Sequence, residues 1–139
     1  MNQNFYDKLN NVIAKDSILI DELMSRHTTF RVGGPADYFV KPHSKEEIAG
    51  VLRTCREYAI PYFILGNGSN LLVGDKGIPG VVIEFGANAS SIEVKENMIH
   101  AEAGALLSKV AHKALEASLG GMEFAAGIPG SIGGAVVMN

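Results

Sequence analysis

The segment that most constrains the fold is a glycine-rich loop that directly follows a short apolar run. The run Tyr62–Leu65 leads into Gly66-Asn67-Gly68-Ser69-Asn70. Four apolar residues bounded by turn residues are typical of a buried strand. The alternate glycines permit positive φ angles and leave out the Cβ atoms that would keep an anion away from the backbone. The pattern therefore predicts a strand that ends in a phosphate-binding loop, and a ligand that carries a diphosphate.

A second glycine cluster lies about sixty positions downstream, in Gly127-Ile128-Pro129-Gly130-Ser131-Ile132-Gly133-Gly134-Ala135. Two such loops suggest a clamp on one ligand. A Rossmann fingerprint would need a third glycine where Leu71 stands, and no Gly-Lys-Ser/Thr follows either cluster, which disfavours both common nucleotide motifs.

Neither loop contains Lys or Arg, but this does not exclude an anionic ligand. A hydrogen bond to a charged group contributes roughly 1.5–3 kcal/mol, whereas an exposed ion pair contributes about 0–1 kcal/mol. Several backbone donors therefore outweigh one surface lysine. The alternative reading is that both clusters are ordinary tight turns.

Length and composition indicate a globular chain. Its 139 residues suit one domain, and with 47% hydrophobic and 19% charged residues it has no apolar run near the roughly 18 residues that span a bilayer. A net charge of −3 without a basic patch argues against nucleic-acid binding. The first eight residues lack a signal-peptide pattern and Cys55 is the single cysteine, so we expect a cytoplasmic protein without disulfides.

Hydrophobic periodicity predicts a parallel βαβ unit in the first part of the chain. A helix over 3–13 precedes a strand over 37–40, and Ser44 with Glu47 forms a capping box for a helix that ends near residue 57. The next strand begins at Pro61 and ends at the first glycine loop. The apolar face of the second helix is expected to bury Ile48, Val51, Leu52, Cys55 and Ala59.

The pattern changes after this unit. We expect a third strand over 81–84, a hairpin that pairs 91–94 with 98–101, and a helix over 105–119 whose C′ residue is Gly120. Leu107, Val110, Ala111, Ala114, Leu115 and Leu119 form the expected apolar face of that helix. Gly104 precedes the helix and would let its first turn approach a ligand. The simplest arrangement is one compact unit with two lobes.

Few other residues suggest chemistry. The histidines His27, His43, His100 and His112 are scattered and lack metal-site spacing. Glu84 and Glu123 are each either a buried carboxylate near a site or a solvated end of an element. Arg31 either reaches an anion or pairs with Asp37. No catalytic set follows from spacing, so the residues alone indicate only a diphosphate-containing cofactor.

Three segments together resemble the family of UDP-N-acetylenolpyruvoylglucosamine reductases, also called UDP-N-acetylmuramate dehydrogenases. They are 28–37 (TTFRVGGPAD), 65–73 (LGNGSNLLV) and 121–135 (GMEFAAGIPGSIGGA). The resemblance extends from about Ile18 to the last residue. It implies an α/β (α+β) FAD-binding domain of the p-cresol methylhydroxylase type, in which a βαβ parallel lobe precedes the start of a second, mixed lobe. This domain would span residues 1–139 and be truncated at its C-terminal end, with residues 1–17 as a helical extension.

The resemblance also implies the cofactor and its binding residues. FAD would be held without a covalent link, because Gly68-Ser69-Asn70 stands where related oxidases often carry a flavin-linking histidine. The expected cofactor-binding residues are Leu65, Gly66, Asn67, Gly68, Ser69, Asn70, Leu71, Gly127, Ile128, Pro129, Gly130, Ser131, Gly133, Gly134 and Ala135. NADPH would be the reductant and an enolpyruvyl UDP-sugar the substrate, in peptidoglycan synthesis, with no nucleic-acid or membrane partner.

The catalytic Arg, Ser and Glu of the family have no matching position among these residues, so no catalytic residue is assigned and we expect this chain by itself to be inactive. Two functions remain open from the sequence. One is the cofactor-binding part of an oxidoreductase, and the other is a non-catalytic module that binds a flavin or a nucleotide diphosphate.

Overall fold

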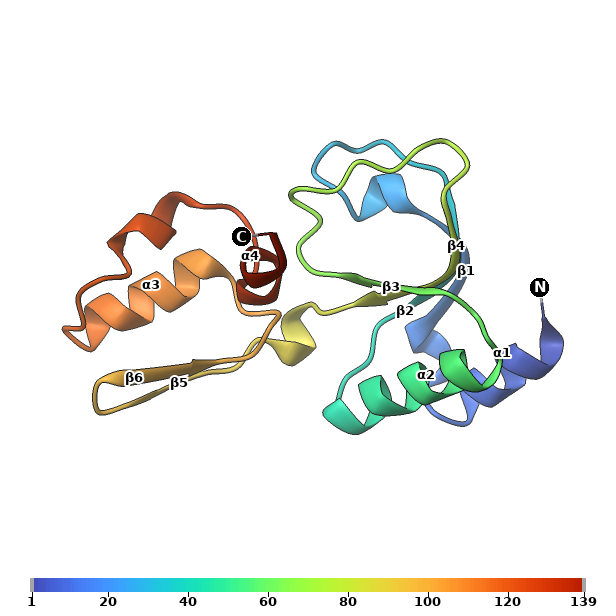
Figure 1. Cartoon of the computed structure of the whole chain (residues 1–139), viewed down its shortest axis with the longest axis horizontal. Helices are drawn as coiled ribbons and strands as arrows, with labels where there is room; N and C mark the ends of the chain where they lie inside the picture. Colours follow the sequence, from blue (N-terminus) through green and yellow to red (C-terminus); the bar gives the residue numbers. More distant parts are fainter. Residues whose placement is uncertain (1, 139) are drawn as a thin grey trace. The chain divides into compact units, whose positions relative to one another are not determined.

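The computed structural model describes residues 2–138, and these residues form two compact units (Figure 1). Unit 1 comprises residues 2–65 and 70–84, and unit 2 comprises residues 66–69 and 85–138. The short segment Gly66–Ser69, which is the first glycine loop, therefore belongs with the C-terminal half of the chain. None of the described helices is long and apolar enough to cross a bilayer.

Unit 1 is built on a four-stranded sheet. Its strands are β1 (Ile18–Leu23), β2 (Pro35–Val40), β3 (Tyr62–Leu65) and β4 (Ile78–Glu84), in the order β1-β2-β4-β3. β4 pairs in parallel with both β2 and β3, and β1 pairs antiparallel with β2. The parallel strands expected from the sequence are present. However, β4 lies between β2 and β3, and the antiparallel β1 was not predicted.

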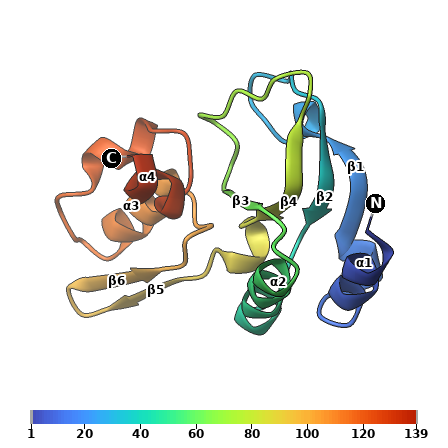
Figure 2. The ribbon, with the colours of Figure 1, turned by 45° about the vertical axis from the view of Figure 1, so that its right-hand side comes forward.

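Two helices cover the face of the sheet that carries Tyr38. They are α1 (Gln3–Asn10) and α2 (Lys45–Glu57), and they lie side by side (Figure 2). The Phe5 ring of α1 makes edge contacts with Tyr38 and Tyr58 at centroid distances of 5.1 and 5.6 Å. Cys55 is fully buried on α2, as its periodicity predicted. Three-residue 3-10 turns over Lys15–Ser17 and Met24–Arg26 flank β1.

Local signals predicted both the start and the end of α2 correctly, but not the conformation of the residues after it. Ser44 Oγ accepts a hydrogen bond from the Glu47 amide at 3.1 Å. In a usual capping box the Glu47 carboxylate would accept a hydrogen bond from the Ser44 amide. Here it accepts one from the His43 amide instead. Ala59 was expected in the core but lies past the helix, exposed and with a φ of 52°.

The opposite face of the sheet is covered by irregular segments instead of a helix. Phe39 and Val82 of the sheet pack there with Met24 and Val73. Met24 lies in the segment that leads to the glycine pair Gly33-Gly34, and Val73 lies in the loop after Asn70. The Gly34 amide donates to the Gly74 carbonyl at 3.0 Å and joins these segments. Ala36 and Leu65 complete this core.

Unit 2 combines an antiparallel hairpin with short helices. The hairpin is formed by β5 (Ile92–Lys95) and β6 (Met98–Ala101), and it follows a 3-10 turn over Ala87–Ala89. α3 (Leu107–Glu116), a 3-10 segment (Glu123–Gly127) and α4 (Ile132–Met138) complete the unit. Its core is Leu107, Ala111 and Ala125. The predicted hairpin and the change of sheet type are confirmed.

The end of α3 differs from the prediction. Ser118, with a φ of 57°, takes the left-handed C′ position that was assigned to Gly120. Its amide donates to Leu115 and the Leu119 amide donates to Ala114, which together make a Schellman motif. Leu115 was also expected on the buried face, but it is 72% exposed although it lies within the helix.

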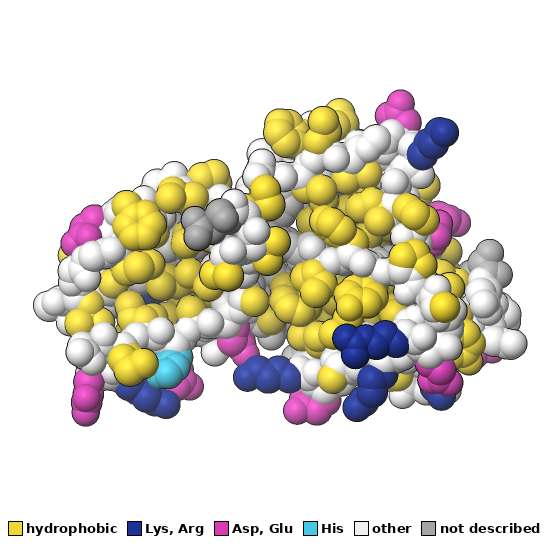
Figure 3. Space-filling model, in the orientation of Figure 1, with side chains coloured by type: hydrophobic (Ala, Val, Ile, Leu, Met, Phe, Trp, Pro, Cys, Tyr) yellow, Lys and Arg dark blue, Asp and Glu magenta, His cyan; other side chains and the backbone are white. Residues whose placement is uncertain are grey.

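Apolar side chains are also exposed on the surface of both units (Figure 3). In unit 1, Tyr62, Phe63 and Ile64 of β3 are 39–48% exposed, so the strand was predicted correctly but its burial was not, because β3 is an edge strand. In unit 2, Phe124, Val136 and Val137 are 70–82% exposed. Exposed apolar side chains on an edge strand are typical of a surface that another segment covers.

Candidate functional site

Residues of the two glycine loops meet within unit 2. The Ser69 hydroxyl donates to the Pro129 carbonyl at 3.4 Å. A Cβ atom added to Gly130 would lie 3.3 Å from Ser69 Oγ, and one added to Gly66 would lie 2.6 Å from Ser131 Oγ. Segments some sixty residues apart are therefore in direct contact, as a two-loop clamp requires.

Several backbone donors in these loops have no acceptor in the protein. Within residues 2–138, the amides of Asn67, Gly68, Ser69, Gly130 and Ser131 donate no hydrogen bond. Gly68 and Gly130 have φ angles of 63° and 135°, which residues with a side chain rarely adopt. Successive amides around such residues form the concave, electropositive backbone arrangement that binds anions. The loops therefore offer a set of neutral donors suited to a phosphate group.

The rest of the second glycine motif has a different local role. The amide of Gly133 donates to Ala103 at 2.8 Å, that of Gly134 to Ser131 Oγ at 3.2 Å, and that of Ala135 to the Ser131 carbonyl at 2.9 Å. A Cβ atom on Gly133 would lie 2.9 Å from that of Ala103. These residues are held by the protein's own groups, and the glycine at 133 is required for packing.

The remaining expected binding residues divide between the two units. Leu65 is buried in the core of unit 1 and Leu71 packs against it, while Asn70 is exposed in that unit. Gly127 and Ile128 are exposed in unit 2.

Other residues considered from the sequence have structural partners. Asp37 makes no ion pair with Arg31 in the described chain, and its carboxylate instead accepts from the Gly80 amide at 2.7 Å. The Glu123 carboxylate accepts from the Gly121 amide at 2.8 Å. Gly104 packs tightly, because a Cβ atom there would lie 2.5 Å from the Gly86 carbonyl oxygen.

One charged cluster was missed from the sequence. His27, with an 11% exposed side chain, stacks on Phe39 at a centroid distance of 4.0 Å. Its Nε2 lies 2.9 Å from a Glu22 carboxylate oxygen and its Nδ1 lies 3.7 Å from one of Glu84. Glu22 and His27 are five residues apart, but Glu84 comes from the distant strand β4, so no spacing could have joined all three.

The pKa of Glu22 reflects this cluster. Burial acts to raise it, but the hydrogen bond from His27 and the nearby charge of Arg26 together lower it below the ordinary value. The remaining histidines show no metal site, since residues 2–138 hold no group of three potential ligands. His43 Nε2 lies 3.0 Å from Ser17 Oγ.

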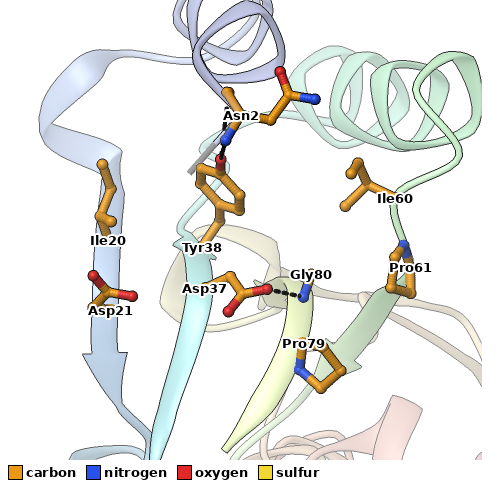
Figure 4. A pocket seen from close by; sticks show the side chains of 9 residues that line it. All are labelled: Asn2, Ile20, Asp21, Asp37, Tyr38, Ile60, Pro61, Pro79 and Gly80. Carbon is orange, nitrogen blue, oxygen red and sulfur yellow. Dashed lines mark hydrogen bonds between the residues drawn. The ribbon is translucent and has the colours of Figure 1, made fainter.

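A separate hollow of about 360 Å³ lies in unit 1 (Figure 4). Asp21, Asp37 and Tyr38 contribute polar groups to it, and Ile60 and Pro61 are among its apolar residues. The Asn2 amide donates to the Tyr38 hydroxyl at its edge. None of the residues around it belongs to the glycine loops, so it is distinct from the predicted cofactor-binding residues.

Comparison with known proteins gives a consistent result. A family model described as an FAD binding domain matches residues 36–139. UDP-N-acetylenolpyruvoylglucosamine reductase of Clostridium perfringens (strain SM101 / Type A) is 53% identical over the whole of this chain and 46% of its own length. The protein of the same name from Clostridioides difficile (strain 630) is 48% identical over 99% of this chain and 45% of its own length. The chain thus spans about half the length of these curated relatives.

Solved structures agree on the fold. UDP-N-acetylenolpyruvylglucosamine reductase from Thermus caldophilus matches with a TM-score of 0.67 and 36% identity, over 86% of this chain and 41% of that one. p-Cresol methylhydroxylase matches with a TM-score of 0.62 and 17% identity, over 84% of this chain and 25% of that one. The second likeness shows the fold alone and supports the expected fold type.

Proposed function

Because this chain belongs to the FAD binding domain family, we propose that its two glycine loops bind the diphosphate of FAD without a covalent link. The observation that carries the proposal is the contact of Ser69 with Pro129, which brings the unpaired amides of both loops together. Hydrogen bonds to a charged group contribute roughly 1.5–3 kcal/mol each. A few such bonds suffice for binding by loops that lack Lys and Arg.

The roles of the residues follow from their backbone environment. The amides at 67–69 and at 130–131 are proposed to donate to the phosphate oxygens, because they have no acceptor within the described residues. Within unit 2, Gly66, Pro129, Gly133, Gly134 and Ala135 are proposed to hold these donors in place, because each of them contacts the other loop or the turn around Ser131. Leu65, Asn70, Leu71, Gly127 and Ile128 stay proposed cofactor-binding residues on the family resemblance. FAD, when bound, supplies hydride-transfer chemistry, and the protein supplies binding, orientation and electrostatics.

We propose further that the chain is the FAD-binding part of an NADPH-dependent reductase that acts on an enolpyruvyl UDP-sugar in peptidoglycan synthesis. The identity of 48–53% to proteins named UDP-N-acetylenolpyruvoylglucosamine reductase supports this assignment. Under it the protein works in the cytoplasm, and residues 1–139 form one FAD-binding domain with residues 1–17 as its helical extension.

Titration of the purified chain with FAD tests the proposal. We expect flavin absorbance to remain after desalting and flavin fluorescence to change on binding. ADP should compete because it carries a diphosphate, whereas riboflavin should compete poorly. Absence of any FAD binding would overturn the assignment, and equal competition by riboflavin would show that the loops do not recognise the diphosphate.

A further inference from the structure

Gly66 is a glycine for a reason that differs from the other residues of its loop. Its φ lies outside the left-handed region in which Gly68 and Gly130 are found. A side chain is instead excluded by one atom, because an added Cβ would lie 2.6 Å from Ser131 Oγ. The Ser131 Cβ would be 3.7 Å away, which is an ordinary van der Waals distance. Only the hydroxyl therefore forbids a methyl group at position 66.

The hydroxyl of Ser131 is firmly held. The residue is 3% exposed, and its Oγ accepts the hydrogen bond from the Gly134 amide. Backbone bonds on either side anchor the same turn, since Leu107 donates to the Gly130 carbonyl at 3.0 Å and Ile132 donates to the Ala105 carbonyl at 2.8 Å. The hydroxyl cannot turn away from Gly66 without losing its bond to Gly134.

We propose that Ser131 is a positioning residue. Its buried hydroxyl packs against Gly66, fixes the position of that residue, and so sets the separation of the two loops that bind the diphosphate. This inference rests on the proposed function. The side chain faces Gly66 and Gly134, so it acts on the ligand through the position of the first loop, while the backbone amide of Ser131 remains open to the phosphate.

The steric contact between Gly66 and Ser131 predicts how substitutions at the two positions combine. Gly66→Ala is expected to weaken FAD binding by about tenfold, which corresponds to about 1.4 kcal/mol. Ser131→Ala should weaken it by about threefold, because the bond from the Gly134 amide is lost and Gly66 is no longer held at its position by the hydroxyl. In the double variant the added methyl meets Cβ at 3.7 Å instead of Oγ at 2.6 Å, so its affinity should return to that of Ser131→Ala alone.

Gly133→Ala is the matched control. It adds the same methyl group to the second loop, but the clash is with Ala103 at 2.9 Å and not with Ser131. Its effect on FAD affinity should persist in the Ser131→Ala background. Rescue of Gly66→Ala without rescue of Gly133→Ala is the expected result. Additive losses for Gly66→Ala and Ser131→Ala would overturn the proposal, because they would mean that Ser131 contributes through a direct contact.

Urea unfolding of the four FAD-free proteins, namely the parent chain, both single variants and the double variant, separates this inference from the proposed function. Non-additivity of the unfolding free energies should show the Gly66–Ser131 contact even without ligand. If the parent chain binds no FAD, the proposed function fails. Non-additive unfolding free energies would then show a purely structural contact between Gly66 and Ser131, and the positioning role would be rejected. If the stabilities are additive, the steric contact itself is absent and the inference fails, whatever the FAD affinity.

Discussion

The Ser69 hydroxyl donates a hydrogen bond to the Pro129 carbonyl at 3.4 Å, across a sequence separation of 60 residues. This contact joins the first glycine loop to the second within one unit. It makes the spacing of the two loops a property of the protein rather than of a bound ligand. Pre-organisation of this kind lowers the entropic cost of binding.

Gly68→Val and Gly130→Val are each expected to weaken FAD binding strongly while changing helical content little. Both glycines have positive φ angles, and a β-branched residue disfavours that region. The strain is on the order of 1–3 kcal/mol, which alone predicts a five- to more than hundredfold weaker affinity. Fluorescence titration and far-UV circular dichroism measure the two quantities. Unchanged affinity in both variants would identify the loops as ordinary turns.

Cys55→Ala is expected to lower the unfolding free energy by about 1 kcal/mol without altering FAD affinity. The side chain is fully buried on α2, and it lies outside both glycine loops. Native Cys55 should also react slowly with a thiol reagent, and urea-unfolded protein should react rapidly. Rapid labelling of the native protein would contradict the burial.

Burial raises the pKa of the Cys55 thiol to about 11 from an ordinary value of 9.0. The folded state therefore holds the proton more tightly than the unfolded state does. The corresponding stability is fully present below pH 9.0 and is lost as the pH rises toward about 11. We expect the thermal midpoint of the parent chain to fall more steeply over this window than that of Cys55→Ala.

Glu22→Gln should reduce the sensitivity of the protein to acid. The pKa of Glu22 lies below its ordinary value of 4.5, because the bonds and charges of His27 and Arg26 outweigh the opposing effect of burial. Its contribution to stability is thus present above pH 4.5 and is lost as the pH falls through the lowered value. Glu46→Gln, which removes an exposed carboxylate on α2, is the control. Equal acid sensitivity in the parent and in Glu22→Gln would show that the His27 cluster contributes nothing.

The 139-residue chain is expected to give no measurable turnover with FAD, NADPH and the enolpyruvyl UDP-sugar. The resemblance assigns no catalytic residue within it, and the loss of general acid catalysis alone lowers a rate by about 10²–10⁴. NADPH oxidation that depends on the UDP-sugar is the measurement. Robust turnover by protein free of contaminating reductase would place the catalytic groups within these residues.

Local sequence signals predicted the elements whose boundaries depend on neighbouring residues. Ser44 and Glu47 mark the start of α2, two short segments expected to pair mark the β5–β6 hairpin, and apolar runs mark β3 and β4. Helical periodicity likewise placed Cys55 in the core. These signals act over a few residues, so they can be read from the local sequence without knowledge of the tertiary contacts.

The tertiary structure alone decided the relationships between distant segments. Insertion of β4 between β2 and β3, the antiparallel pairing of β1, and the enclosure of His27 by Glu22 and Glu84 each depend on which surfaces pack together. The sequence by itself predicted two glycine loops, and phosphate binding by their amides stays a prediction. Only folding decided that Ser131 fills the space beside Gly66, because that contact depends on the packing of residues 65 positions apart and leaves no pattern in either segment.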